Sequence, residues 1–295
     1  MGTIIKATGI STDNAIKSSN ENAIAAGQQC IEAAGIDVND IDLLINVGIY
    51  RDENMLEPAM AAFAQKGLGI KPDYAKSQPF NAAFSLDMMN SACGIINAIQ
   101  TADAMFRSRQ IKYALIVSGD AHPSNKELES FPYAAIGAAM LLEYTEDEKG
   151  FQNFSFKHSP TTEHSVRGYL DFNNLAEPAK ERLTVDVPAE YKEKLLEFAG
   201  ESVQEYLVSY KLDRHTVKLV TPQVEEGFGR KVAESVDIND DTIMDLYKEY
   251  GDAHSSALTM AYHLGAEKGL YNSNDNVLFV AAGAGLTSAC VSYTV

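Results

Sequence analysis

The chain has 295 residues, 45% of them apolar, with 24 Lys plus Arg against 41 Asp plus Glu and a formal net charge of −17 at pH 7. This acidity argues against a surface that follows nucleic-acid phosphates, and the apolar fraction suffices for a sizeable core. No apolar run reaches the about 18 residues of a membrane span, and MGTIIKATGISTDN lacks the pattern of a signal peptide. We therefore expect a globular, cytoplasmic protein that binds neither nucleic acid nor a membrane.

The first half of the chain alternates between strand and helix patterns. After a first strand, apolar residues at helical spacing predict a helix over 20–34, and DVNDIDLLINVGIY predicts a loop leading into a buried strand. Residues 55–67 again predict a helix, and FNAAFSLDM predicts a short strand. The periodic helix in CGIINAIQTADAMFRSRQ leads to the apolar strand YALIVSGD, and AAIGAAMLLEY predicts another strand before the charged turn TEDEKG.

The second half repeats this order. It opens with FQNFSFKHSP and an extended polar stretch over 161–188, followed by a predicted helix over 191–210 and a strand in VKLVTPQ. Further helices are predicted near 230–236 and over 255–268, and NVLFVAAGAGLTSACVSYTV predicts two strands joined by a glycine-rich turn. Such alternation favours an α/β fold whose sheets carry helices on both faces. The repeat predicts two similar halves in one compact body, residues 1–148 and 149–295.

Cys93 is the residue with the strongest pattern for nucleophilic chemistry. It stands between a strand and a long helix in SLDMMNSACGIINAIQ, where the helix dipole and unpaired N–H groups favour a thiolate. Gly94 permits close packing or an unusual turn, and the small residues Ser91 and Ala92 leave space for a substrate. The alternative is a structural role in the core, since cysteine is among the most buried residue types.

The remaining cysteines and the histidines do not predict a metal site. Cys30 lies in an amphipathic helix and Cys290 in the last strand, and both are interpreted as core residues. The three cysteines lack CxxC spacing and the six histidines lack an HExxH pair, so neither a disulfide framework nor a metal is expected. Four histidines are interpreted as surface or core residues: His158, His164, His215 and His263.

Three segments resemble one enzyme family. SACGIINAIQTADAMFRSRQIKYALIVSGDA resembles the nucleophile segment of the ketoacyl-acyl-carrier-protein synthase III branch of the thiolase superfamily. GAGLTSACVSYTV resembles the glycine-rich turn and final strand of those enzymes, and GDAHSSALTMAYHL resembles their GNTSA helix start. The resemblance implies a thiolase fold, in which two similar βαβαβαββ-type halves form a layered α/β/α/β/α body.

The resemblance also implies an active site. In the family, a cysteine attacks an acyl thioester, two backbone N–H groups form an oxyanion hole, and a histidine and an asparagine support decarboxylation of a malonyl thioester. By position, Cys93 is the implied nucleophile. The implied oxyanion donors are the N–H groups of Cys93 and of Ala284 in the GAG turn. No cofactor is expected.

Two positions depart from the family pattern. Gln223 stands where the histidine is expected, and Asp252 stands where the asparagine is expected. A carboxylate cannot donate hydrogen bonds to a developing enolate and repels its charge, which argues against ordinary malonyl condensation. His254 is a candidate replacement base, oriented by Asp252. The alternative is that Asp252 caps the following helix and His254 is a partly buried neighbour.

The resemblance further implies a dimer joined through sheet edges, either a homodimer or a heterodimer with a related thiolase-fold chain. The apolar stretch 80–86 is the expected contact, and Phe80 or Phe84 is expected to reach the substrate tunnel. His122, which follows a predicted strand end near the nucleophile helix, is a further tunnel candidate.

The acyl donor is expected to be acyl-CoA or an acyl carrier protein. The chain has no tryptophan and only a short segment before the 20–34 helix, where the family grips coenzyme A, and this favours a carrier protein or a partner as donor. An acidic carrier needs a basic patch, for which Arg107, Arg109 and Lys112 are candidates. The alternative for these cations is a favourable position at a helix C-terminus.

Three hypotheses for function follow. The first is an acyltransferase that forms an acyl-thioester on Cys93 and passes the acyl group to a small-molecule or carrier-bound acceptor in fatty-acid-like, polyketide or secondary-metabolite biosynthesis. The second is a decarboxylative ketoacyl synthase with the unusual set Gln223, Asp252 and His254. The third is an impaired thiolase-fold subunit that pairs with an active homologue.

Overall fold

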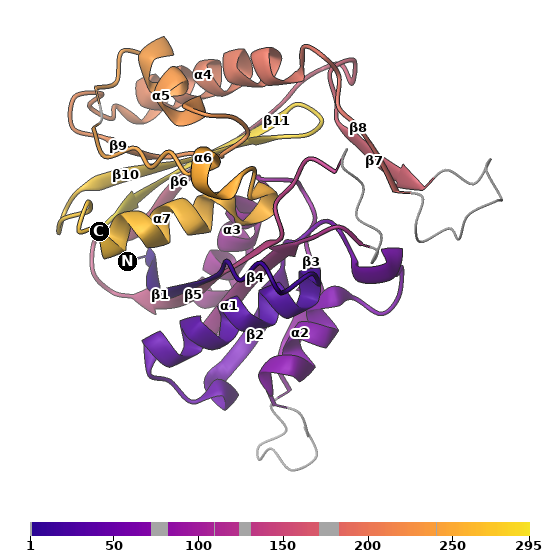
Figure 1. Ribbon diagram of the computed structural model, residues 1–295. Helices are drawn as coiled ribbons and strands as arrows, with labels where there is room; N and C mark the ends of the chain where they lie inside the picture. The colour runs from indigo at the N-terminus through magenta and orange to yellow at the C-terminus, as the bar shows by residue number, and fades with distance from the viewer. Residues whose placement is uncertain (1, 72–81, 109, 124–130, 171–182, 240) are drawn as a thin grey trace.

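The computed structural model describes residues 2–71, 82–108, 110–123, 131–170, 183–239 and 241–295 (Figure 1). In these residues nine strands form one mixed sheet in the order β3-β2-β4-β5-β1-β6-β11-β10-β9, and β7 and β8 pair separately. Alternating helices and strands give the α/β class that the hydrophobic pattern predicted, and that prediction is confirmed. Within the described ranges, no helix combines the length and apolar character needed to cross a bilayer.

The first half contains five strands and three α-helices in the described residues. They are β1 (Gly2–Ser11), α1 (Ser19–Ala34), β2 (Ile41–Asn46), α2 (Met60–Leu68), β3 (Phe84–Asp87), α3 (Gly94–Arg107), β4 (Tyr113–Asp120) and β5 (Ile136–Thr145). Short 3₁₀ turns lie at Val38–Asp40 and Asp52–Asn54.

The second half contains β6 (Gly150–His158), β7 (Arg167–Leu170), β8 (Leu183–Asp186), α4 (Tyr191–Tyr210), β9 (Lys218–Val220), α5 (Phe228–Ser235), α6 (Tyr247–Tyr250), a 3₁₀ turn (His254–Ser256), α7 (Ala257–Glu267), β10 (Asn276–Gly283) and β11 (Thr287–Thr294). The polar stretch after β6 holds the β7–β8 hairpin, which its sequence did not predict because it lacks an apolar alternation.

The two halves repeat one sheet topology. In the first, β2 runs parallel to β4, β5 is antiparallel to β4, and β1 is antiparallel to β5. In the second, β9, β10, β11 and β6 follow the same rules. The halves join where Thr3 of β1 pairs with Phe151 of β6. The domain boundary placed at 148/149 falls in the turn between β5 and β6 and stays a prediction.

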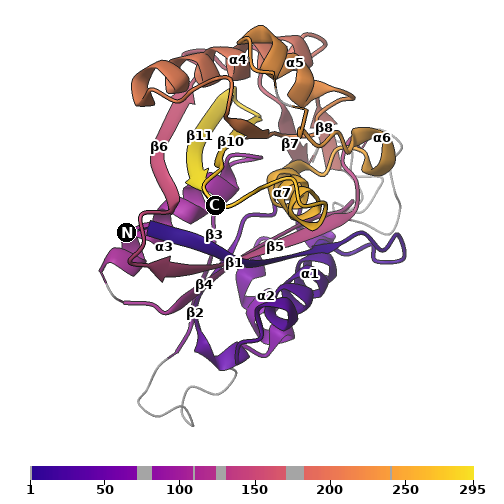
Figure 2. The ribbon, with the colours of Figure 1, turned by 90° about the vertical axis from the view of Figure 1, so that its left-hand side faces the viewer.

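Helices lie on both sides of each half-sheet and between the halves (Figures 1 and 2). Helices α1 and α2 cover one face of the first half, α4 and α5 cover the outer face of the second, and α3 and α7 lie between them. Alternation along the strands explains this layering: Leu115 of β4 faces α1 while Ile116 faces the central helices. On β10, Leu278 faces α4 while Phe279 faces the centre. The layered α/β/α/β/α arrangement is therefore confirmed.

The layering gathers four chain segments at one edge of the central layer. Ser91 follows β3 and precedes α3, and Asp120 ends β4. From the other half, His254 precedes α7 and Ala284 follows β10. Loops at the carboxyl ends of strands in α/β folds are the usual place for ligand sites, and here both halves contribute to the same place.

Candidate active site

Ser91 lies in an unusual backbone conformation in the turn between β3 and α3. Its φ of 46° is in the left-handed region, which non-glycine side chains rarely adopt. Gly283, at the end of β10, packs against it, and a Cβ on Gly283 would lie 2.5 Å from Ser91 Oγ. Such a strained position persists only when the surroundings enforce it, and strain of this kind clusters at functional sites.

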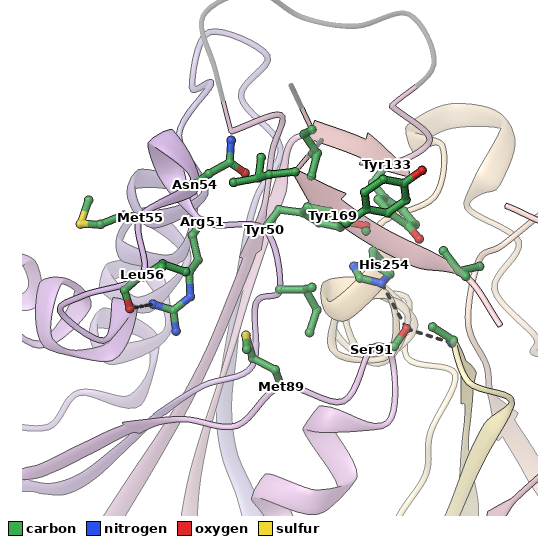
Figure 3. Close-up of a pocket in the computed structure, with 16 residues that line it drawn as sticks. Tyr50, Arg51, Asn54, Met55, Leu56, Met89, Ser91, Tyr133, Tyr169 and His254 are labelled. Carbon is green, nitrogen blue, oxygen red and sulfur yellow. Dashed lines mark hydrogen bonds between the residues drawn. The ribbon is translucent and has the colours of Figure 1, made fainter. Parts of the chain in front are cut away.

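The hydroxyl of Ser91 contacts two groups from the second half of the chain. Its Oγ lies 3.1 Å from Nε2 of His254 and accepts a hydrogen bond from the N–H of Ala284 at 3.4 Å. Figure 3 shows the side chains of Ser91 and His254 directed toward one another at the wall of a cavity. His254 also has a positive φ, of 44°. Two reactive side chains are thus held together on strained backbone.

His254 is oriented by Asp120 rather than by Asp252. The Nδ1 atom of His254 lies 3.0 Å from Oδ2 of Asp120. The ring of Tyr133 stacks on the imidazole with centroids 4.0 Å apart, which fixes the ring plane. Asp120 is fully buried, and its Oδ1 accepts the N–H groups of Ile49 at 2.9 Å and of Tyr50 at 3.0 Å. These bonds leave the carboxylate little freedom to turn away.

The electrostatics support an ionised Asp120 beside a basic imidazole. Burial acts to raise the pKa of Asp120, but the charge and hydrogen bond of His254 and the hydrogen bonds of Ser255 and Tyr50 outweigh it and lower that pKa to about 2. Burial acts to lower the pKa of His254, but the charge and hydrogen bond of Asp120 raise it above the ordinary 6.5. Ionised Asp120 can only accept hydrogen bonds, so Nδ1 of His254 carries the proton and Nε2 accepts from Ser91.

The resulting chain Ser91–His254–Asp120 has the connectivity of a nucleophile, a general base and an orienting carboxylate. A serine hydroxyl is a weak nucleophile by itself and needs such a base. Ala284 N–H donates to this same hydroxyl oxygen and so lies next to the attacking atom, where a substrate carbonyl oxygen would also come within its reach. The geometry suits attack on an acyl carbonyl.

Cys93 occupies a different environment from the one that its position predicted. It is completely buried in the central core, and its Sγ donates to the carbonyl of Thr287 at 3.5 Å. Burial, followed by proximity to Cys290, raises the pKa of its thiol far above the usual range. Its N–H, the implied oxyanion donor, donates to the carbonyl of Asn90 at 2.9 Å. The nucleophilic role of Cys93 stays a prediction, and these contacts favour Ser91. Cys30 and Cys290 are buried, as interpreted.

Gln223 is buried and Asp252 is half-buried near the site, but each binds backbone groups. The side chain of Gln223 donates to the carbonyls of Thr221 and Met244 at 3.2 and 3.0 Å and accepts from the N–H of Leu246 at 2.8 Å. Asp252 Oδ1 accepts the N–H of His254 at 2.8 Å, but Asp252 does not cap a helix, because Ala253 precedes the 3₁₀ turn and Ser256 precedes α7. The expectation that Asp252 orients the His254 ring is wrong, because the ring bonds Asp120 instead. Burial raises the pKa of Asp252 to about 6.

A cavity of about 660 Å³ begins at Ser91 and His254. Its walls are mainly apolar, and include Tyr50, Met55, Leu56, Met89, Val166 and Leu170 (Figure 3). Arg51 also lines it, but its guanidinium pairs with Asp87. An apolar cavity that ends at a polar reactive group suits the chain of an acyl substrate.

The two predicted tunnel residues that the structure describes, Phe84 and His122, do not form this wall. Phe84 is 57% exposed on the edge strand β3, and the ring of His122 packs on Phe131 with centroids 5.1 Å apart. Phe80 lies outside the described residues. The basic patch proposed for a carrier lies at the far end of α3, whose 14 residues place it about 21 Å from the nucleophile end. There Arg107 pairs with Asp103 and Lys112 with Asp40, while Arg109 lies outside the described residues.

Sequence reasoning missed Ser91 and Asp120. The sequence did contain a signal for Asp120, because the motif GDAH occurs twice, at 119–122 and at 251–254, and the second copy contains the candidate His254. The structure joins the aspartate of the first copy to the histidine of the second, although 134 residues separate them.

Comparison with known proteins agrees with this architecture. A family model described as the C-terminal part of 3-oxoacyl-[acyl-carrier-protein] synthase III matches residues 211–295. Beta-ketoacyl-[acyl-carrier-protein] synthase III from Clostridium beijerinckii is 23% identical over 299 residues, which cover 97% of this chain and 88% of that one. The enzyme of the same name from Listeria welshimeri is 25% identical over 278 residues, which cover 90% of this chain and 80% of the other.

Solved structures share the fold over the whole chain. OleA from Xanthomonas campestris, crystallised with lauric acid and lauroyl-CoA, superposes with a TM-score of 0.81 at 16% identity, covering 100% of this chain and 99% of that one. The 3-oxoacyl-[acyl-carrier-protein] synthase III of Aquifex aeolicus gives a TM-score of 0.79 at 16% identity, covering 100% of both chains.

The duplicated layers, with a site between the two halves, are the fold that this chain shares with the solved OleA and 3-oxoacyl-[acyl-carrier-protein] synthase III structures. The matched C-terminal segment and the curated relatives show that the chain is similar to beta-ketoacyl-[acyl-carrier-protein] synthase III, as its nucleophile segment and glycine-rich turn indicated.

Proposed function

We propose that this protein is an acyltransferase that takes an acyl group from a thioester onto Ser91 and passes it to a hydroxyl or amine acceptor. The observation that carries the proposal is the hydrogen-bonded chain Ser91–His254–Asp120 at the end of an apolar cavity. The curated relatives named above are beta-ketoacyl-[acyl-carrier-protein] synthases III, which supports acyl transfer as the class of reaction.

Acylation proceeds by attack of Ser91 Oγ on the thioester carbonyl. His254 Nε2 accepts the hydroxyl proton, and Asp120 stabilises the imidazolium that forms. Ala284 N–H, together with the N–H of the attacking residue, stabilises the oxyanion. Collapse of the intermediate expels the thiol, which takes its proton from His254, and leaves an oxygen ester on Ser91.

The chemistry of the site favours a heteroatom acceptor over malonyl condensation. Decarboxylation calls for hydrogen-bond donors that stabilise an enolate, whereas Asp252 brings a carboxylate and Gln223 is held by backbone groups. Among the described residues that line the cavity, His254 is the only histidine, and its Nε2 is within hydrogen-bond distance of Ser91 Oγ. One base next to the acyl group suffices to deprotonate a hydroxyl or amine.

The donor and the assembly are also proposals. The similarity to beta-ketoacyl-[acyl-carrier-protein] synthase III supports an acyl carrier protein as donor, with acyl-CoA as the second candidate. A homodimer or a heterodimer with a related chain is supported by β3, which ends the sheet and exposes Phe84. Small molecules or carrier-bound groups of fatty-acid-like, polyketide or other secondary-metabolite biosynthesis are the candidate acceptors.

Intact-mass analysis tests the proposal. The wild-type protein, Ser91→Ala and Cys93→Ala are incubated with a panel of acyl-CoA and acyl-carrier thioesters, and each adduct is treated with neutral hydroxylamine, which cleaves thioesters far faster than oxygen esters. In samples quenched during turnover, we expect one acyl group on wild type and Cys93→Ala, resistant to hydroxylamine, and none on Ser91→Ala. An adduct that requires Cys93 and is cleaved by hydroxylamine would support the thioester hypothesis instead. Absence of any adduct together with absence of thiol release would favour the partner-subunit hypothesis.

A further inference from the structure

A second, much smaller space lies beside Ser91. It measures about 20 Å³, against about 660 Å³ for the acyl cavity. Its walls include Ser91, His254 and Asp252, together with Tyr133, Tyr191 and Val224. Ser91, His254 and Tyr133 line both spaces, so the reactive pair stands between them.

The size and polarity of the small space suit one water molecule. A cavity needs about 10–15 Å³ to hold a water, which then requires two to four polar partners. Ser91, His254 and Asp252 bring a hydroxyl, an imidazole and a carboxyl group to the wall. An alcohol or amine with a carbon skeleton does not fit in such a volume, whereas an acyl chain has its own cavity on the other side.

Water can reach the small space without crossing the acyl cavity. A recess of about 160 Å³ shares four lining residues with it: Tyr133, Tyr191, Val224 and Asp252. The recess extends to the exposed Lys192 and to Val187, which is 40% exposed, and it therefore reaches the protein surface. The acyl group and the water thus reach Ser91 through separate spaces.

We infer that the protein is also a hydrolase, in which a water in the small space cleaves the acyl group from Ser91. The inference rests on the proposed acyl-Ser91. Water attacks the ester carbonyl, His254 Nε2 takes its proton, and the ester C–O bond breaks. Ser91 regains a proton from His254, and the acyl group leaves as a carboxylic acid. The net reaction converts one thioester and one water into one acid and one thiol.

Asp252 is the positioning residue for this water. Its Oδ1 is bound to the N–H of His254, and its carboxyl group borders both the small space and the recess. Burial raises the pKa of Asp252 to about 6, so at neutral pH it is mostly ionised and accepts hydrogen bonds from a water.

The test makes the same Val→Ile change at two positions, one in each space beside Ser91. Val224→Ile adds a methylene group to the small space, whereas Val166→Ile adds it to the acyl cavity. An acyl thioester is supplied without any other acceptor, and thiol release, acid release and protein mass are followed. We expect wild type to release acid and thiol in equal amounts. Val224→Ile should release acid about tenfold or more slowly and accumulate acyl-enzyme after a normal first turnover. Val166→Ile should change the preferred chain length without accumulating acyl-enzyme.

The outcomes separate this inference from the proposed function. A stable acyl-Ser91 in the wild type, with no acid released, overturns hydrolysis and leaves acyl transfer intact. Acid release that Val224→Ile does not slow overturns the assignment of the water to the small space. A wild type that forms no adduct and releases no thiol overturns both. Thermal unfolding of the two variants checks that each is folded.

Discussion

Ser91 and Cys93 lie in the same turn, yet the protein surrounds them in opposite ways. Ser91 borders a cavity and contacts an imidazole and a backbone N–H. Cys93 is fully buried among apolar side chains, and burial raises the pKa of its thiol. A thiol is intrinsically the better nucleophile, but it reacts as a thiolate, which this burial disfavours. In the proposed mechanism, access to substrate and a nearby proton acceptor decide which of the two residues reacts, and the type of side chain does not.

Removal of the Ser91 hydroxyl should have the largest effect on acylation, and it tests the contrast between Ser91 and Cys93 directly. For Ser91→Ala we expect thiol release from an acyl thioester to slow by about 10⁴-fold or more, because the nucleophile of the triad is lost. Stopped-flow detection of the released thiol measures it. Ser91→Cys is the matched control, since a thiol at this position keeps the base and regains an adduct. Thiol release by Ser91→Ala at the wild-type rate contradicts the assignment.

Asp120→Asn should have the next largest effect. Loss of the orienting carboxylate favours the wrong tautomer of His254 and should lower the acylation rate by about 10³–10⁴-fold. The wild-type rate should rise with pH through a pKa above 6.5, because His254 acts as a base only when neutral. In Asp120→Asn this midpoint should move to lower pH, since burial then acts on the imidazole without the opposing charge. Profiles of acylation rate against pH for wild type and Asp120→Asn measure the rate loss and the midpoint. The same midpoint in both proteins would rule out Asp120 as the group that raises the pKa of His254.

Gly283→Ala should slow acylation less than the two preceding substitutions do. The added Cβ would lie 2.5 Å from Ser91 Oγ and 2.8 Å from its Cβ, so the hydroxyl must shift. A displacement of about 1 Å costs about 100-fold in rate. The measurement is single-turnover acylation, with Gly35→Ala as a control remote from the site. Full activity in Gly283→Ala would show that the hydroxyl tolerates displacement.

Cys93→Ala should change activity least. The thiol lies in the core, so we expect an unchanged acylation rate and a loss of about 1 kcal/mol in the free energy of unfolding from the small cavity left behind. Urea unfolding and acylation kinetics on the same sample test this. Loss of acylation with stability intact would return the nucleophilic role to Cys93.

The fold was largely predictable from the sequence, and the site only in part. The helix over 191–210 and the strand YALIVSGD have the bounds predicted, because their apolar residues repeat over enough length to fix the period. His254 was a candidate replacement base because a histidine two residues from Asp252 can be oriented by that carboxylate. Ser91 was interpreted only as a small neighbour of Cys93. Its side-chain direction depends on contacts with Gly283 and His254 in the second half of the chain, which the local sequence does not reveal.

The two halves meet through the pair Thr3 and Phe151 and through the central helices, and the proposed catalytic groups are divided across that junction. The nucleophile and the carboxylate belong to one half, and the imidazole and the oxyanion donor belong to the other. Neither half by itself therefore carries a working set. The proposed acyl transfer therefore depends on the alignment of the two halves. A small displacement of one half against the other would separate Ser91 from His254 and stop the reaction, although every strand and helix stayed intact.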